Sequence, residues 1–96
     1  MRPMTEPLEM PIDGTLDLHT FRPDEVKDLV RDYLAECVKR GILEVRIIHG
    51  KGVGTLREIV HAVLKNMPEV ESYQLAGGEG GGWGATIVIL KPGKAV

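Results

Sequence analysis

The chain has 96 residues, enough for one small domain with a single hydrophobic core and too few for a second independent domain. Its 12 Lys and Arg residues stand against 14 Asp and Glu residues, and the net charge of −2 argues against strong non-specific binding to nucleic acid while leaving room for a local basic patch. The single cysteine, Cys37, excludes an internal disulfide and a multi-cysteine zinc site, and it fits a reducing compartment.

Residues 1–11 are rich in Pro, Met and Glu without periodicity, which predicts a flexible N-terminal arm. This arm lacks the apolar stretch of a secretory signal, and no apolar run in the chain is long enough to span a bilayer. We therefore expect a cytoplasmic protein that makes no membrane contact.

A half-buried strand, a helix and a second strand are predicted after the arm. Leu16 and Leu18 alternate with polar residues, as in a strand with one covered face. Pro23 suits the first turn of a helix, and Gly41 stands where its C-terminal cap belongs. Residues 45–48 are apolar at nearly every position, which predicts a covered or central strand. The apolar residues at helical spacing in between are Val26, Leu29, Val30, Tyr33, Leu34, Cys37 and Val38.

The second half of the domain is predicted to contain one helix and two strands. Residues 56–67 show apolar side chains at helical spacing, and Pro68 ends this helix. Residues 70–76 alternate moderately, whereas residues 85–90 form a continuous apolar run suited to a central strand. The predicted order is β-α-β-α-β-β, with two right-handed parallel crossovers and a final antiparallel connection. The fold class is therefore α/β, a mixed four-stranded sheet with two helices, over residues 12–92 and followed by a C-terminal tail at 93–96.

Residues 47–57 are the most informative segment, because an apolar strand ends there in a histidine and a glycine-spaced turn before a helix begins. Glycines bring backbone N–H groups close to a ligand, the helix N-terminus adds unpaired donors and partial positive charge, and Lys51 adds a full charge. The segment matches neither GxGxxG nor GxxxxGK[ST], so we expect an anion site without a nucleotide cofactor. The expected phosphate-binding residues here are Gly50, Lys51, Gly52, Gly54, Thr55 and Arg57.

Three polar or glycine-rich segments are expected to meet at one edge of the sheet. Open α/β sheets bind ligands at the carboxyl edge of their strands, and residues 17–20, the His49 turn and the glycine loop at 77–84 all follow strands, provided that the third strand runs parallel to the second. Asp17 and His19 lie two apart and point to the same face of a strand, where a carboxylate can fix a histidine's tautomer and raise its basicity. His49 beside a phosphate would be placed for proton transfer or for holding an oxyanion.

Each of these residues also has a purely structural interpretation. Asp17 can cap a turn while His19 bonds to backbone, and His49 can be an ordinary turn residue. Lys51, inside the turn, is the better candidate for a phosphate contact than Arg57, and each can equally be a solvated charge.

Other candidate groups have less to support them. Trp83 can stack on a base or on an apolar ligand group, or it can anchor the glycine loop. His61 falls with Arg57 and Glu58 on the polar side of the second helix and is expected at the surface, whereas Cys37 is expected in the core. No HExxH, CxxC or acidic cluster supports a metal site, so no cofactor is assigned, and a divalent metal such as Mg or Mn is left open.

Three segments make the chain resemble the Smr (small MutS-related) domain family over about residues 13–91. They are Leu16-Asp17-Leu18-His19, the segment from His49 to Arg57, and the segment from Gly81 to Val88. By position, Asp17 and His19 match the family's LDLH residues, and Thr20 stands where the family commonly has glycine. His49, Gly50, Lys51 and Gly52 match its HGxG segment, and Gly81, Gly82, Trp83 and Gly84 match its glycine loop.

The resemblance implies a two-layer α/β sandwich like the C-terminal domain of translation initiation factor 3, of the stand-alone bacterial type related to the C-terminal domain of MutS2. It also implies nucleic-acid binding with the nicking endonuclease activity reported across the family, in DNA repair and recombination. On this hypothesis Asp17 orients His19, His49 is the acid–base or oxyanion partner, and Lys51 with backbone N–H groups holds a phosphate of branched DNA or structured RNA.

Two other functions stay open from the sequence. The first is a non-catalytic adaptor that docks on structured nucleic acid or on a nucleoprotein through the same edge. The second is a small phosphorylated-metabolite site, because a backbone cradle suits any phosphate. A homodimer and a ribosomal or other nucleoprotein partner are likewise left open.

Overall fold

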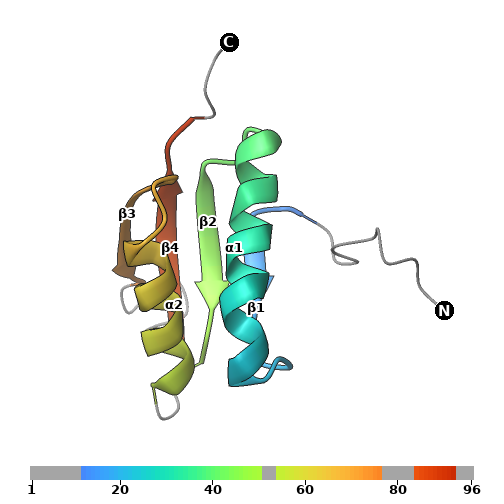
Figure 1. Ribbon diagram of the computed structural model, residues 1–96. Helices are drawn as coiled ribbons and strands as arrows, with labels where there is room; N and C mark the ends of the chain where they lie inside the picture. The colour runs from blue at the N-terminus through green and yellow to red at the C-terminus, as the bar shows by residue number, and fades with distance from the viewer. Residues whose placement is uncertain (1–11, 51–53, 77–83, 93–96) are drawn as a thin grey trace, which may run out of the picture.

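The structure is a computed structural model that describes residues 12–50, 54–76 and 84–92 (Figure 1). The predicted arm, the tail at 93–96 and most of the glycine loop lie outside these residues. The described elements are β1 (Thr15–Asp17), α1 (Pro23–Lys39), β2 (Glu44–Ile48), α2 (Thr55–Lys65), β3 (Val70–Leu75) and β4 (Ala85–Leu90). This order confirms the predicted β-α-β-α-β-β succession.

The four described strands form one mixed sheet in the order β1-β2-β4-β3. β1 and β2 pair in parallel, and β4 is antiparallel to both of its neighbours, β2 and β3. β3 therefore runs in the same direction as β2 although β4 lies between them, which confirms the direction assumed for the third strand. The carboxyl ends of β1, β2 and β3 consequently lie at one edge of the sheet.

Both helices lie on the same face of the sheet, so the domain has two layers (Figure 1). Burial alternates along β1, where Leu16 is buried and its neighbours Thr15 and Asp17 are exposed. Leu16 pairs with Ile47 of β2, which is also buried, so these side chains face the helices and Asp17 points to the uncovered face. The core between the layers contains Leu16, Leu18, Val26, Val30, Tyr33, Leu34, Cys37, Val45, Ile47, Val60, Val63, Leu64, Val88 and Leu90.

Helix α1 begins and ends where the sequence predicts. Pro23 occupies its first turn, and the Glu25 carboxylate accepts the backbone N–H of Arg22 at 2.9 Å, so a donor that precedes the helix is satisfied. Gly41 follows the helix with φ +75°, a conformation that glycine adopts without steric cost. Cys37 is buried on the inner face, and burial raises the pKa of its thiol to about 11, as expected for a core residue.

The hydroxyl of Tyr33 fixes the start of β1 against α1. Tyr33 is fully buried, and its oxygen accepts the backbone N–H of Gly14 at 3.1 Å and donates to the carbonyl oxygen of Thr15 at 3.1 Å. The carbonyl of Gly14 in turn accepts the N–H of Arg46 in β2 at 2.8 Å. One buried phenol thus positions the short strand that carries Asp17.

Candidate functional site

Backbone hydrogen bonds hold three chain segments together at the carboxyl edge of the sheet. The N–H of Leu18 donates to the carbonyl of Ile48 at 2.8 Å, and the N–H groups of His49 and Gly50 both donate to the carbonyl of Gly84, each at 2.8 Å. The ends of β1 and β2 and the start of β4 are therefore adjacent, as the sequence predicts. The candidate residues Lys51, Gly52, Gly81, Gly82 and Trp83 lie outside the described residues.

Asp17 and His19 form a hydrogen-bonded pair at this edge. One carboxylate oxygen of Asp17, Oδ1, lies 2.7 Å from His19 Nδ1 and accepts the His19 backbone N–H at 3.0 Å. These hydrogen bonds, the backbone one first, lower the pKa of the Asp17 carboxyl. Because a carboxylate only accepts, Nδ1 carries the proton, and Nε2 is the basic nitrogen of the neutral ring. The His19 and Asp17 side chains are 70% and 46% exposed, so this base is open to solvent.

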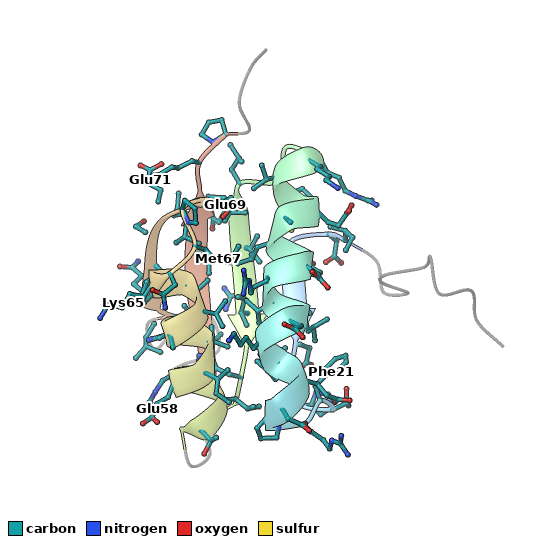
Figure 2. All side chains as sticks on the ribbon, in the orientation of Figure 1. Phe21, Glu58, Lys65, Met67, Glu69 and Glu71 are labelled. Carbon is teal, nitrogen blue, oxygen red and sulfur yellow. The ribbon has the colours of Figure 1, made fainter. Side chains whose placement is uncertain are left out.

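His19 lies in the turn after β1 and not on the strand itself, and this turn accommodates Thr20 without strain. The N–H of Phe21 donates to the carbonyl of Leu18 at 2.9 Å, and the half-buried Phe21 ring lies beside the start of α1 (Figure 2). No non-glycine residue in the described part of the chain has positive φ, so the exposed Thr20 does not need glycine's conformational freedom. The change from the glycine common in the family is therefore compatible with this backbone.

His49 projects to the opposite face of the sheet, under α2. Its side chain is nearly buried, at 6% exposure, and Nε2 lies 2.8 Å from Thr86 Oγ1 while Nδ1 lies 3.2 Å from the carbonyl oxygen of Gly50. Burial, with Arg57 as a smaller cause, lowers the pKa of His49. Both ring nitrogens of His49 thus have partners within the protein, whereas in His19 only Nδ1 is bonded to a described residue.

The prediction that His61 lies at the surface is wrong. His61 Nε2 lies 2.9 Å from the same Thr86 hydroxyl, and its ring packs against that of Tyr73 with centroids 5.0 Å apart. His61 comes three residues before the buried Leu64, so it borders the apolar stripe of α2 and turns toward the sheet. Burial is also the main reason why the pKa of His61 is lowered.

Thr86 is the site residue to which the sequence analysis gave no role. Its side chain is fully buried in the central strand β4, between Ala85 and Ile87. The available signal was a hydroxyl within an apolar run, because a buried hydroxyl must find a hydrogen-bond partner. Here it finds two histidines.

The glycine turn, residues 50–54, is described at its first and last residues, and Gly54 leads directly into α2. Gly50 and Gly54 have φ +86° and +91°, and a Cβ added to Gly54 would lie 3.0 Å from Arg57 Nη2. Arg57 therefore folds back over the first turn of α2, whereas the exposed Glu58 points outward (Figure 2). The helix dipole disfavours a cation there and favours an anion, so the position of Arg57, beside the exposed Thr55, suits a bound phosphate.

The described residues form neither a metal-binding cluster nor a membrane-spanning helix, and their pocket shares no residue with the site. The part of the chain that the structure describes contains no group of three or more His, Cys, Asp and Glu side chains that could hold a metal ion. Within the same residues no helix has both the length and the apolar character needed to cross a membrane. A pocket between α1 and α2, lined by Lys27, Arg31, Ile59 and Met67 among others, is formed by none of the site residues.

The fold and its sequence motifs together define a small α/β domain of the Smr type. The model of the Smr domain family matches residues 16–91, and the chain belongs to this family. Two relatives named Endonuclease MutS2, from Thermomicrobium roseum and Halothermothrix orenii, are 40% and 42% identical to the chain over 80 residues. Each match covers 83% of this chain and 10% of the relative, so the chain spans about a tenth of the length of these relatives.

Two solved structures share the fold. The Smr domain of Thermus thermophilus MutS2 superposes with a TM-score of 0.79 at 34% identity, over 83% of this chain and 100% of that domain. YdaL, a stand-alone small MutS-related protein from Escherichia coli, superposes with a TM-score of 0.77 at 29% identity, over 84% of this chain and 66% of YdaL. The expected fold class and the resemblance to the Smr family are both confirmed.

Proposed function

We propose that this domain nicks phosphodiester bonds in structured nucleic acid, with His19 as its acid–base residue. The observation that carries the proposal is the 2.7 Å bond from His19 Nδ1 to Asp17, in a ring that is 70% exposed. It leaves a basic Nε2 available to a substrate, with the opposite nitrogen fixed by a carboxylate. The proposal agrees with the relatives of this chain that are named Endonuclease MutS2.

In the proposed reaction, water attacks the phosphorus atom and gives a proton to His19 Nε2. The new P–O bond forms as the P–O ester bond breaks, and the imidazolium returns the proton to the leaving alkoxide. Asp17 stabilises the imidazolium between these steps. Because both nitrogens of His49 are occupied internally, we give the acid–base role to His19 and give His49 a structural part in the glycine turn.

Backbone phosphates would bind at the start of α2, at the same edge of the sheet as this pair. Arg57 and the N-terminal turn of α2, with Gly54 and Thr55, supply positive potential at the same sheet edge. The other phosphate contacts that we propose are predicted from the sequence alone. They involve Gly50, Lys51, Gly52, Gly81, Gly82, Trp83 and Gly84. Since the chain has a net charge of −2, affinity has to come from this local edge and not from a general basic surface.

Branched DNA and structured RNA are the proposed substrates, in a role in DNA repair and recombination. We place the activity in the cytoplasm, because the single cysteine is a buried free thiol suited to a reducing compartment. A divalent metal, a homodimer and a ribosomal partner stay predictions to be tested with the substrate.

A non-catalytic adaptor is the second candidate function. The internal engagement of His49 favours it, because the histidine of the glycine turn then has no ring nitrogen left for a substrate. An adaptor would bind the same nucleic acids through Arg57 and the glycine turn, and His19 would have no effect on turnover.

The test is a binding and cleavage assay on labelled branched DNA, duplex DNA and structured RNA, with and without Mg²⁺ or Mn²⁺. We expect His19→Ala to reduce cleavage by about 10²–10⁴-fold with binding retained. Glu69→Ala, at the far end of the sheet (Figure 2), is the control for contaminating nuclease and should match wild type. Equal cleavage by His19→Ala and wild type would refute the role of His19, and binding without cleavage by wild type would identify an adaptor.

A further inference from the structure

We propose that Thr86 and His61 are positioning residues, which hold His49 in a single tautomer and thereby fix the start of the glycine turn. Only the catalytic meaning of this inference rests on the proposed function, because the arrangement itself is a property of the fold. It concerns a series of hydrogen-bonded side chains, the buried His49 and Thr86 and the partly buried His61, on the face of the sheet opposite the Asp17–His19 pair.

The chain of contacts joins three elements that are distant in sequence. Thr86 Oγ1 in β4 lies 2.8 Å from His49 Nε2, just after β2, and 2.9 Å from His61 Nε2 in α2. His49 Nδ1 continues the chain to the carbonyl oxygen of Gly50, at 3.2 Å. One hydroxyl oxygen therefore connects both histidines to the first residue of the turn.

Counting the hydrogens fixes the donor and the acceptor in each of these hydrogen bonds. The Gly50 carbonyl can only accept, so His49 Nδ1 carries a hydrogen, and Nε2 of the neutral ring is then an acceptor. Thr86 must donate its single hydroxyl hydrogen to that Nε2. Its oxygen is left to accept from His61, which therefore carries its hydrogen on Nε2. The two histidines are accordingly expected in opposite tautomers, His49 as Nδ1–H and His61 as Nε2–H.

The surroundings keep both rings neutral, as this proton count requires. Burial lowers the pKa of each histidine, and the neighbouring His49 and then Arg57 of α2 act in the same direction on His61. Tyr73 of β3 packs against the His61 ring. The His49 and His61 rings meet edge to face, with centroids 6.3 Å apart. A second proton on His49 would also leave the Thr86 hydroxyl hydrogen without its acceptor.

The consequence for the site is that Gly50, the first residue of the glycine turn, is held at both its N–H and its carbonyl. The carbonyl of Gly84 accepts both the His49 and the Gly50 N–H, while Nδ1–H of the His49 ring donates to the Gly50 carbonyl. Gly50 has φ +86°, and a glycine can adopt many other backbone conformations. Contacts from outside the residue are therefore needed to select this one. Thr86 and His61 act on the phosphate-binding turn only through His49.

Nuclear magnetic resonance of the ¹⁵N-labelled 96-residue chain at pH 7 tests the proton arrangement directly. We expect a pyrrole-like Nδ1 and a pyridine-like Nε2 for His49, and a pyrrole-like Nε2 for His61. A pyridine-like Nδ1 in His49, or a doubly protonated His49, would overturn the proposal.

Two substitutions at one position test the positioning role. Thr86→Val removes the hydroxyl at nearly constant volume, and we expect exchange of the Gly50 amide hydrogen to rise roughly fivefold or more, together with more than one orientation of the His49 ring. Thr86→Ser keeps the hydroxyl and should restore the wild-type signals. The inference fails if Thr86→Val behaves as wild type. It also fails if Thr86→Ser behaves as Thr86→Val, because the effect would then come from packing and not from the hydroxyl.

A second pair of variants applies if Thr86→Val does not fold. His61→Gln keeps an N–H donor and should preserve the His49 signals, whereas His61→Met lacks the donor and should lose them. Equal behaviour of these two variants would contradict the proposal.

Cleavage kinetics separate this inference from the proposed nuclease. In Thr86→Val we expect KM to rise several-fold with kcat retained, because Asp17 and His19 lie on the other face of the sheet. If wild type does not cleave but shows the expected tautomers, the nuclease proposal fails and the positioning role stands. If wild type cleaves with His49 in the other tautomer, the reverse holds.

Discussion

Replacing Asp17 with Asn separates the chemical role of this carboxylate from its structural one. Asn keeps an oxygen that can accept the His19 backbone N–H, which Asp17 now binds at 3.0 Å. It removes the negative charge that lies 2.7 Å from His19 Nδ1. The shape of the turn is therefore preserved, while the carboxylate that orients the ring and would stabilise the imidazolium is lost.

The structure sets different magnitudes for these two roles. The side chains of His19 and Asp17 are 70% and 46% exposed, and exposed ion pairs contribute about 0.2–1 kcal/mol to the free energy of unfolding. A loss of about 1 kcal/mol would lower the Tm of a domain of this size by roughly 4–8 °C, so a smaller shift is expected. An acid–base residue contributes about 10²–10⁴-fold to rate, so Asp17→Asn should slow cleavage by about 100-fold or more.

The assay compares thermal unfolding, nucleic-acid affinity and the cleavage rate for wild type, Asp17→Asn and Asp28→Asn. Asp28 is an exposed carboxylate on α1, so its substitution is a matched control for the change in net charge. We expect only Asp17→Asn to lose cleavage, with affinity and Tm close to those of the control. A cleavage rate within threefold of wild type would refute the argument, and a large fall in Tm would show that the carboxylate is mainly structural.

Three further predictions concern stability and binding. Tyr33→Phe should lower the free energy of unfolding by about 1–3 kcal/mol, because the N–H of Gly14 loses its buried acceptor; an unchanged urea midpoint would contradict this. Since burial lowers the pKa of His49 and His61 in the folded state, the unfolded chain binds more protons below about pH 6.5, so the Tm should fall as the pH drops from 7 to 5. His61→Gln should reduce that dependence, and an equally steep profile would argue against it. Arg57→Gln should weaken nucleic-acid binding and reduce the magnitude of its salt slope by about 1, measured by titration at several salt concentrations; an unchanged slope would remove Arg57 from the phosphate contacts.

The elements of this fold could be predicted because their signals are local. The apolar spacing of α1, with Gly41 after it, identifies a helix without knowledge of its partners. The apolar run of residues 85–90 likewise indicates a strand with neighbours on both sides, although it does not say which ones. That β4 separates β2 from β3 depends on contacts between distant segments.

Side-chain direction at the site was harder to predict, because it depends on register and on the pleat. Asp17 and His49 end neighbouring strands, yet one projects to the uncovered face and the other beneath α2. The position of His61 depends on a partner 25 residues away in β4, so the polar side of a helix drawn from the sequence did not reveal it. The Asp17–His19 pair, two residues apart at the end of β1 and in the turn that follows it, needed no such long-range information, although the sequence placed both residues on the strand.

The order of the strands in the sheet also determines when each strand can pair during synthesis. β1, α1 and β2 follow one another in the chain. β1 and β2 can pair, with α1 packed on them, as soon as all three have left the ribosome. Among the described strands, β3 pairs with β4 alone, so it has no strand to join until residues 85–90 have been made. The last strand therefore enters between two that are already present. We expect the nascent chain to pass through a half-sheet with an unpaired β2 edge, the stage at which binding by a chaperone or by a second nascent copy would be most competitive.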